Sequence, residues 1–322
     1  MTVRLIYIGG YSRSGSTLLL RLLGEVPGLQ PVGELFDLWE RSYTENQLCG
    51  CGDAFRECAF WRAVTLRAFG SAPEEIAVDS LQAMRARVQG YSHIPQLWMP
   101  LLRDRGYKER LDEYIGVLSR VYRAIAEISH AEYIVDSSKI PQFAWLLGEM
   151  PETELHLVHL VRDSRATAYS WRRRRVRPEI AWRVEHMDRH SILRSALEWD
   201  LFNFMLRSRR RSPASYTLIR YEDLVRDPAR QLERIASSIG ENWSAPSEVI
   251  ANGQLNLHVS HTASGNPSRF KAGEMEVRPD EEWVRSMRAD EKALVSVLTI
   301  SGLARYGYPL KQRRPEARPG RL

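Results

Sequence analysis

The sequence lacks the features that define several classes of protein. It has only three cysteines among 322 residues, and an odd number without an export signal argues against a disulfide framework. No apolar run approaches the roughly 20 residues that a membrane helix needs, so we predict no membrane span. The apolar stretch at the N-terminus is too short for a signal peptide, and Arg13 follows it closely. These absences predict a soluble, cytoplasmic protein.

The three cysteines, Cys49, Cys51 and Cys58, fall within ten residues of one another. A tetrahedral zinc site needs a fourth ligand, and the nearest histidine in the sequence is the distant His93. We therefore predict reduced structural thiols and no metal site, with metal binding or redox chemistry as the alternatives.

The charge of the chain is unevenly distributed. Hydrophobic residues make up 43% and charged residues 27% of the sequence, which is ordinary for a globular protein. The net charge is +6, and residues 162–177 alone carry seven Arg against one Asp. We call this segment the basic arm. Its run Arg172–Arg175 is either a solvated face or a positive rim that attracts anions. No recognition module accompanies the charge, so we expect no nucleic acid as partner.

Short β-rich runs alternate with helical patterns along the chain, which predicts an α/β fold with a central, mainly parallel sheet between two layers of helices. The runs are Arg4–Ile8, Tyr133–Asp136, Leu155–Val161 and Tyr216–Ile219, with a fifth near Gln30–Val32. We expect one domain over residues 1–310, with a helical insertion over about 35–130 and a second helical stretch over Ile180–Arg210. Residues 311–322, with five basic residues and one Glu, predict a disordered basic tail.

The first β-rich run leads into a glycine-rich loop and then an apolar helix over Thr17–Val26. Gly10 and Gly15 have the spacing of a nucleotide-phosphate loop, and Thr17 stands at its hydroxyl position, but Ser16 replaces the usual lysine. Backbone amides at a helix N-terminus still form an anion cradle, and Arg13 supplies a cation. The loop therefore predicts a P-loop-like fold that binds phosphate or sulfate and is poorly equipped for Mg-dependent triphosphate hydrolysis. A glycine- and serine-rich turn without a ligand is the alternative.

The stretch Tyr11–Thr17 resembles the 5′-phosphosulfate loop of the sulfotransferases that use 3′-phosphoadenosine 5′-phosphosulfate (PAPS). An arginine at the position of Arg13 is typical of bacterial members and of the protein-tyrosine branch, whereas the cytosolic branch usually has lysine. The resemblance implies that five loop residues bind the phosphosulfate group: Arg13, Ser14, Gly15, Ser16 and Thr17.

Three further segments resemble the same family. Arg162, at the end of the third long β-rich run, and Ser170, eight residues later, match its 3′-phosphate site. Tyr221 follows the fourth run and is a candidate to face the adenine. Arg269, in a turn rich in Gly, Asn and Pro, resembles the segment that folds over the cofactor. Each has a plainer interpretation, as a strand-end ion-pair partner, a structural residue or a surface turn.

Sulfuryl transfer requires a base for the acceptor hydroxyl and cations for the developing negative charge. In the protein-tyrosine branch a Gly-Glu pair carries the base, and the resemblance points to Glu34. Lys139 is a candidate cation near the bridging oxygen, with Ser138 beside it to hold the cofactor. The plainer alternatives are a helix-start carboxylate for Glu34 and a helix cap with a solvated lysine for the other two. Asp136 resembles the metal-binding Asp of a nucleoside triphosphatase.

The sequence therefore predicts a PAPS-dependent sulfotransferase that transfers a sulfuryl group to an acceptor hydroxyl with a carboxylate base and no metal. Its acceptor is a small molecule, a carbohydrate, a lipid or a peptide. A P-loop phosphotransferase or kinase and a non-catalytic nucleotide-binding module are the alternatives. The oligomeric state stays open.

Overall fold

The computed structural model describes residues 2–174, 176, 180, 185–186, 188–243, 250–251, 254–277 and 279–310. The predicted basic tail, 311–322, lies outside these residues, as do Arg175 and Arg177 of the basic arm.

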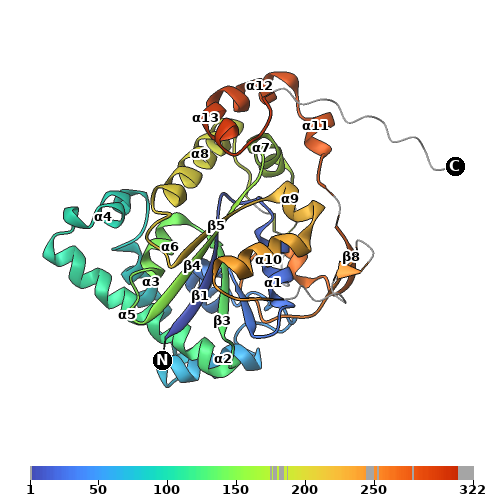
Figure 1. Ribbon diagram of the computed structural model, residues 1–322. Helices are drawn as coiled ribbons and strands as arrows, with labels where there is room; N and C mark the ends of the chain where they lie inside the picture. Colours follow the sequence, from blue (N-terminus) through green and yellow to red (C-terminus); the bar gives the residue numbers. More distant parts are fainter. Residues whose placement is uncertain are drawn as a thin grey trace.

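A parallel sheet of five strands forms the centre of the molecule, in the order β2-β3-β1-β4-β5 (Figure 1). Its strands are β1 (Val3–Gly9), β2 (Leu29–Gly33), β3 (Tyr133–Lys139), β4 (Thr153–Val161) and β5 (Ser215–Arg220). Each of the five β-rich runs seen in the sequence lies within one of them. Helices pack on both faces, so the predicted three-layer α/β fold is confirmed.

Alternate residues of β1 point to opposite helical layers. Leu5 and Tyr7 belong to one buried cluster, and Ile6 and Ile8 belong to another. Because the strand is covered on both faces, all four residues are fully buried, and the run is apolar throughout instead of alternating with polar residues. This burial holds the strand ends in fixed positions.

The helices divide among the two layers and the end of the sheet. The layer on the side of Ile6 contains α1 (Ser16–Gly24) and α10 (Pro228–Ser238). The opposite layer contains α2 (Ala59–Phe69), α5 (Arg105–Ser129) and α6 (Pro141–Leu147). The other helices are α3 (Val78–Ala86), α4 (Ile94–Trp98), α7 (Ser164–Arg172), α8 (Ile192–Ser208), α9 (Tyr221–Arg226), α11 (Glu282–Ser286), α12 (Ala289–Leu298) and α13 (Ile300–Arg305).

Shorter elements complete the described chain. A π-helical turn spans Leu38–Thr44, and 3₁₀ turns span Leu35–Asp37, Pro73–Glu75, Tyr91–His93, Pro100–Leu102 and Pro267–Phe270. A small antiparallel sheet, absent from the sequence prediction, joins β6 (Ile250–Ala251), β7 (Gln254–Leu257) and β8 (Gly273–Glu276). None of the helices in the described part of the chain has the length and apolar character that a membrane crossing requires.

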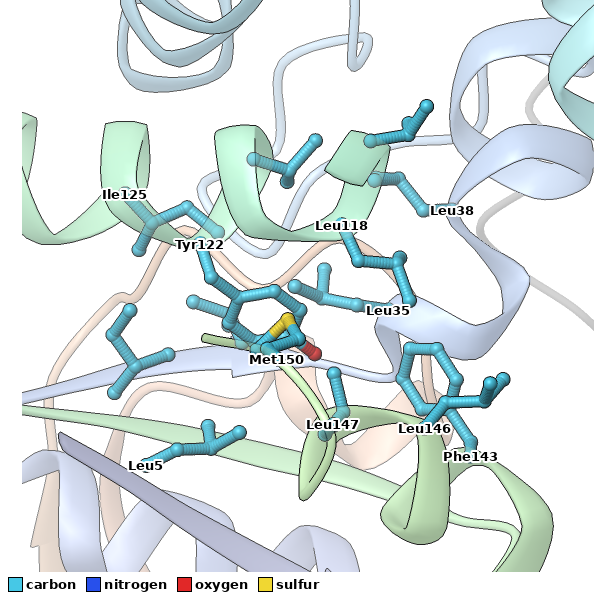
Figure 2. Packing of buried hydrophobic residues seen from close by; sticks show 14 of the residues in the cluster. Leu5, Leu35, Leu38, Leu118, Tyr122, Ile125, Phe143, Leu146, Leu147 and Met150 are labelled. Carbon is cyan, nitrogen blue, oxygen red and sulfur yellow. The ribbon is translucent and has the colours of Figure 1, made fainter. Parts of the chain in front are cut away.

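Helices fill the stretch between β2 and β3, where the sequence predicts a helical insertion. The long helix α5 lies directly on the sheet, and its side chains Leu118, Tyr122 and Ile125 point toward Leu5 of β1 and toward α6 (Figure 2). This helix has an apolar stripe facing the core. The C-terminal part of the predicted insertion is therefore one layer of the sandwich.

The predicted helical stretch over Ile180–Arg210 is wrong for its first described residues, 180, 185–186 and 188–191, which are not helical; residues 181–184 and 187 lie outside the described part. Helix α8 begins only at Ile192, where Ser191 accepts a hydrogen bond from the backbone N–H of Arg194 and so caps the helix. Before it, Val176 and His186 form an isolated antiparallel bridge, which is extended backbone.

The packing of α5 leads to a stability prediction with a matched control. Leu118 is 2% exposed and Leu101 is 98% exposed. We expect Leu118→Ala to lower the free energy of unfolding by about 3 kcal/mol, because it removes buried methyl groups and leaves a cavity. The same change at Leu101 should cost less than about 0.5 kcal/mol. Urea titrations of both variants give these values, and equal losses would contradict the assigned core.

Candidate active site

At one edge of the sheet, each strand ends at or leads into a segment that contains a polar or aromatic candidate residue. The loop 10–17 follows β1, Glu34 follows β2, Lys139 ends β3, Arg162 follows β4 and Tyr221 follows β5. Since all five strands are parallel, their carboxyl ends lie at the same edge of the sheet, where ligands bind in open α/β folds. A cavity of about 470 Å³ opens there. Its wall includes ten of the residues singled out in the sequence: Arg13, Gly15, Ser16, Thr17, Glu34, Ser138, Lys139, Arg162, Ser170 and Tyr221.

The loop after β1 presents a helix N-terminus to this cavity. Gly15 is the N-cap of α1 with φ +95°, and no side chain caps the helix or adds a negative charge in its first turn. A Cβ at Gly15 would lie 2.5 Å from a ring carbon of Tyr221, so only glycine fits. The backbone at Arg13 is also left-handed, with φ +73°. The loop therefore offers amides and a cation to an anion. Ser14 is buried in the loop, and its side chain is outside the described cavity wall.

An ion pair connects the ends of β2 and β3. The Glu34 Oε1 and Lys139 Nζ atoms lie 2.5 Å apart, with side-chain exposures of 17% and 7%. Lys139 also donates a hydrogen bond of 3.0 Å to the carbonyl of Ser137. Its backbone is left-handed, with φ +70°, which is costly for a residue with a side chain. The pair places a carboxylate and an ammonium group in direct contact at the edge where β2 and β3 end.

Asp136 and Ser138 hold the end of β3 in shape. The carboxylate of Asp136 accepts hydrogen bonds from the hydroxyl of Tyr122 and from the N–H and hydroxyl of Ser138, at 2.5 to 2.7 Å. Ser138 in turn accepts one from the backbone N–H of Phe36. Burial raises the pKa of Asp136 to about 6. Asp136 faces the core under α5 and is no part of the described cavity wall, unlike the metal-binding Asp of a nucleoside triphosphatase.

Arg162 joins three parts of the site. Its guanidinium donates to the carbonyl of Arg13 at 3.2 Å and to the carbonyl of Asp280 at 3.0 Å, and it pairs with the carboxylate of Asp280 at 3.2 Å. It also stacks over the ring of Tyr221, 4.3 Å from the centroid. Ser170, buried on α7, lines the same cavity. The structure thus brings together the residues of the predicted 3′-phosphate site.

The segment 262–266 closes the cavity beside β2. The N–H of Ala263 donates to the carbonyl of Val32, and the N–H of Glu34 donates to the carbonyl of Ser264. Gly265 and Asn266 belong to the cavity wall, so this segment lies where the sequence predicts a cover.

Arg269, the residue predicted to bind the cofactor from this segment, is placed differently. Its buried guanidinium donates to the carbonyls of Thr262 and Leu48 at 2.5 and 2.7 Å, and it is outside the described cavity wall. The structure does not bring it to the other site residues. Its contacts hold the segment in place, because a cation beside backbone carbonyls satisfies acceptors that a turn leaves open.

Sequence reasoning missed several residues of the cavity wall. Asp37 and Arg41 form an ion pair of 3.1 Å next to Glu34, and their i, i+4 spacing is a usable helical signal. Trp171 stacks against the guanidinium of Arg13 at 4.8 Å. Asp280 contacts the guanidinium of Arg162 but comes 118 residues later in the sequence. No local sequence pattern identifies Asp280 as a site residue.

Four of the five described arginines of the basic arm, Arg162, Arg165, Arg172 and Arg173, pair with acidic residues. Arg165 is buried and pairs with Asp163 at 2.7 Å. Arg172 pairs with Glu291, and Arg173 pairs with Glu282 at 2.7 Å. Arg172 and Arg173 thus meet acidic residues of α12 and α11, and Arg162 is the arginine of the arm that lies in the cavity wall.

The histidines of β4 are core residues. The ring of His159 is fully buried between Tyr216 and Asn203, with hydrogen bonds of 2.6 and 2.8 Å. Burial lowers its pKa to about 4, so the ring is neutral in the folded protein. His156 is buried as well. Neither lies in the cavity wall, which agrees with the choice of a carboxylate as candidate base.

The neutral state of His159 predicts a pH dependence of stability. An unfolded histidine binds a proton near pH 6.5, whereas folded His159 does so near 4. The unfolded state therefore binds more protons between these values, and stability falls as the pH drops. We expect His159 alone to remove about 2 kcal/mol between pH 7 and pH 5. Urea unfolding at both pH values should show a smaller loss for His159→Gln, and an equal loss in both proteins would refute the assignment.

The fold and this edge define an α/β protein with a P-loop-like arrangement of β1, the loop after it and α1. A family model described as "Sulfotransferase family" matches residues 6–245, and the chain therefore belongs to the sulfotransferase family, as the motifs of the sequence predicted. The match contains Arg13, Glu34, Lys139 and Arg162, and excludes the segment with Arg269. No curated protein matches the chain.

Solved structures share the fold at low sequence identity. The sulfotransferase domain of the Synechococcus PCC 7002 olefin synthase has a TM-score of 0.54 and 19% identity, and the match covers 96% of each chain. The sulfotransferase domain from the curacin biosynthetic pathway has a TM-score of 0.53 and 16% identity, over 97% of this chain and 99% of that one. The fold thus agrees with the family over nearly the whole length.

Proposed function

We propose that the protein transfers the sulfuryl group of PAPS to an acceptor hydroxyl, with Glu34 as the base. The observation that carries the proposal is the Glu34–Lys139 pair, which shares one cavity with the anion-binding loop. A base next to a cation, both close to an anion site, is the arrangement that transfer of a charged group to a hydroxyl needs.

The residues present fit such a nucleotide. The open N-terminus of α1 and the Gly15 cradle under Tyr221 suit the 5′-phosphosulfate, held by residues 13–17. Arg162 and Ser170 suit the 3′-phosphate, since a guanidinium binds phosphate oxygens through two nitrogens. The ring of Tyr221, already stacked on Arg162, is an available surface for the adenine.

PAPS supplies an activated sulfuryl group and leaves as adenosine 3′,5′-bisphosphate. Glu34 accepts the proton of the acceptor hydroxyl on a carboxylate oxygen. Protonation removes the negative charge of Glu34, and Lys139 then holds a positive charge without its partner at 2.5 Å. A cation released in this way stabilises negative charge that develops nearby. Arg13 adds a second cation from the loop.

The alternatives fit the site less well. A kinase of the P-loop type places a lysine in the loop and an Asp on its metal, whereas Ser16 stands at the lysine position and Asp136 is bound to Tyr122 and Ser138. A non-catalytic binding module would not need a buried Lys139 in a strained backbone conformation.

The acceptor enters beside Glu34, where Phe36 and the Asp37–Arg41 pair form the wall. This wall has one aromatic face and two charged groups. It suits the hydroxyl of a small molecule, a carbohydrate, a lipid or a peptide that combines apolar and polar parts.

A ligand test separates the proposed donor from that of a kinase. A ligand that binds only the folded state raises the melting temperature. We expect adenosine 3′,5′-bisphosphate to raise it and ADP with Mg²⁺ to have little effect, measured by thermal unfolding. Arg162→Met should abolish the shift, because it removes the cation of the 3′-phosphate site. A larger shift with ADP and Mg²⁺ would refute the PAPS proposal.

The role of Glu34 is tested by Glu34→Gln. We expect transfer from labelled PAPS, assayed with a panel of acceptors, to fall by about 10²- to 10⁴-fold, as for loss of a general base. Binding of the bisphosphate should be unchanged or tighter, because Lys139 loses its anionic partner. Glu40→Gln, an exposed carboxylate six residues on, is the matched control with normal turnover. Near-normal turnover of Glu34→Gln would remove Glu34 as the base.

A further inference from the structure

The three cysteines of the insertion meet a histidine from the C-terminal part of the chain. Cys49 and Cys51 lie on a turn, Cys58 precedes α2, and His261 lies 203 residues after Cys58. The Cys51 and Cys58 sulfurs are 3.7 Å apart, the Cys58 sulfur is 3.3 Å from His261 Nδ1, and the Cys49 sulfur is 4.0 Å from it. All four ligand atoms lie within 4.8 Å of one another.

These distances agree with tetrahedral zinc coordination. Zinc bonds of about 2.3 Å to sulfur and 2.0–2.1 Å to nitrogen place two sulfurs about 3.8 Å apart, and a sulfur and a nitrogen about 3.6 Å apart. Three thiolates and one imidazole are the ligands of a common structural zinc site, and such soft ligands select zinc over magnesium or calcium. We propose that Cys49, Cys51, Cys58 and His261 bind one Zn²⁺ ion.

The surroundings of the four residues are those of a preorganised site. Backbone hydrogen bonds fix the cysteine loop: the N–H of Cys49 donates to the carbonyl of Asp53 at 2.8 Å, and the N–H of Cys58 donates to the carbonyl of Ala54 at 3.0 Å. These contacts hold the backbone that carries the cysteines, as a metal site requires.

The imidazole is oriented as well. Phe60 stacks on the ring of His261, with centroids 5.1 Å apart and an angle of 12°, and the indole N–H of Trp61 donates to its carbonyl. Such contacts fix the direction of a metal ligand.

A disulfide explains less of this geometry. A bond between Cys51 and Cys58 would use two of the three thiols and would give no role to the buried Cys49 or to the imidazole. Zinc binding uses all four groups: three Zn–S bonds and one Zn–N bond form, and the three thiol protons pass to solvent. With four protein ligands the ion has no open position, so the site is structural.

The ion would fasten the segment that closes the active-site cavity. Directly after His261, the carbonyl of Thr262 accepts a hydrogen bond from the N–H of Gly50, and Ala263 pairs with Val32. Gly265 then lies beside Glu34, since a Cβ added to it would be 3.3 Å from Glu34 Oε1. The site therefore links the cysteine loop to a wall of the cavity.

The test is the metal content of the full chain, expressed with added zinc and analysed by mass spectrometry for metals. We expect about one zinc per chain for the wild type, almost none for His261→Asn, and retention in His261→Cys, which keeps four soft ligands. His258→Asn is the matched control, because His258 lies three residues earlier, is exposed, and pairs with Glu25. It should keep the zinc.

Two further measurements do not depend on the folding of a variant. Replacement of zinc by Co²⁺ in the wild-type chain should produce the absorption of tetrahedral cobalt thiolate, and a chelator should lower the melting temperature. Wild-type protein with no more zinc than His261→Asn, a mass lower by two hydrogens from a disulfide, or iron in place of zinc would each overturn the proposal. None of these readouts requires sulfuryl transfer, so a failure here leaves the proposed function untouched.

Discussion

The parallel orientation of the five strands is the constraint on which the site depends. The strands are short, and a candidate site residue ends each strand or follows it, such as Lys139 at the end of β3, Glu34 after β2 or Arg162 after β4. An antiparallel strand in the same place would have delivered its following residue to the opposite edge. The cavity is therefore a property of the sheet, and the helices fix its depth by fixing the strand ends.

A second constraint acts on the backbone where the strands end. Four positions around the anion site and the ion pair have left-handed backbone: Arg13, Gly15, Gly33 and Lys139, with φ between +70° and +95°. Glycine tolerates this conformation, but an arginine or a lysine has to be held in it by its surroundings. The two residues that bear side chains are the two candidate catalytic cations. Both line the same cavity.

The sequence made the sheet and the loop predictable, because both depend on local patterns. Apolar runs of strand length mark the five strands, and Gly10 to Thr17 form a contiguous motif. Parallel strands then bring Glu34, Lys139 and Arg162 to one edge without any knowledge of long-range contacts. The start of α8 at Ser191 is also a local signal, but the stretch before it lacks one. Contacts that span the chain, such as Asp280 with Arg162, leave no local pattern and could not be predicted.

The contacts of Arg269 and His261 also involve residues far away in the sequence, so local patterns could not predict them. Both lie in the segment 261–269, which resembled a cofactor cover by its turn residues. Its path is determined by carbonyls of Leu48 and Val32 and by the N–H of Gly50, all in the N-terminal fifth of the chain. A Cβ on Gly33 would lie 2.6 Å from the carbonyl oxygen of Ser264. Because glycine has no Cβ, the segment can lie directly against β2. Arg269, which the sequence predicts to bind the cofactor, thus stabilises this packing instead. His261, which has no cysteine near it in the sequence, lies among the three cysteines in the fold.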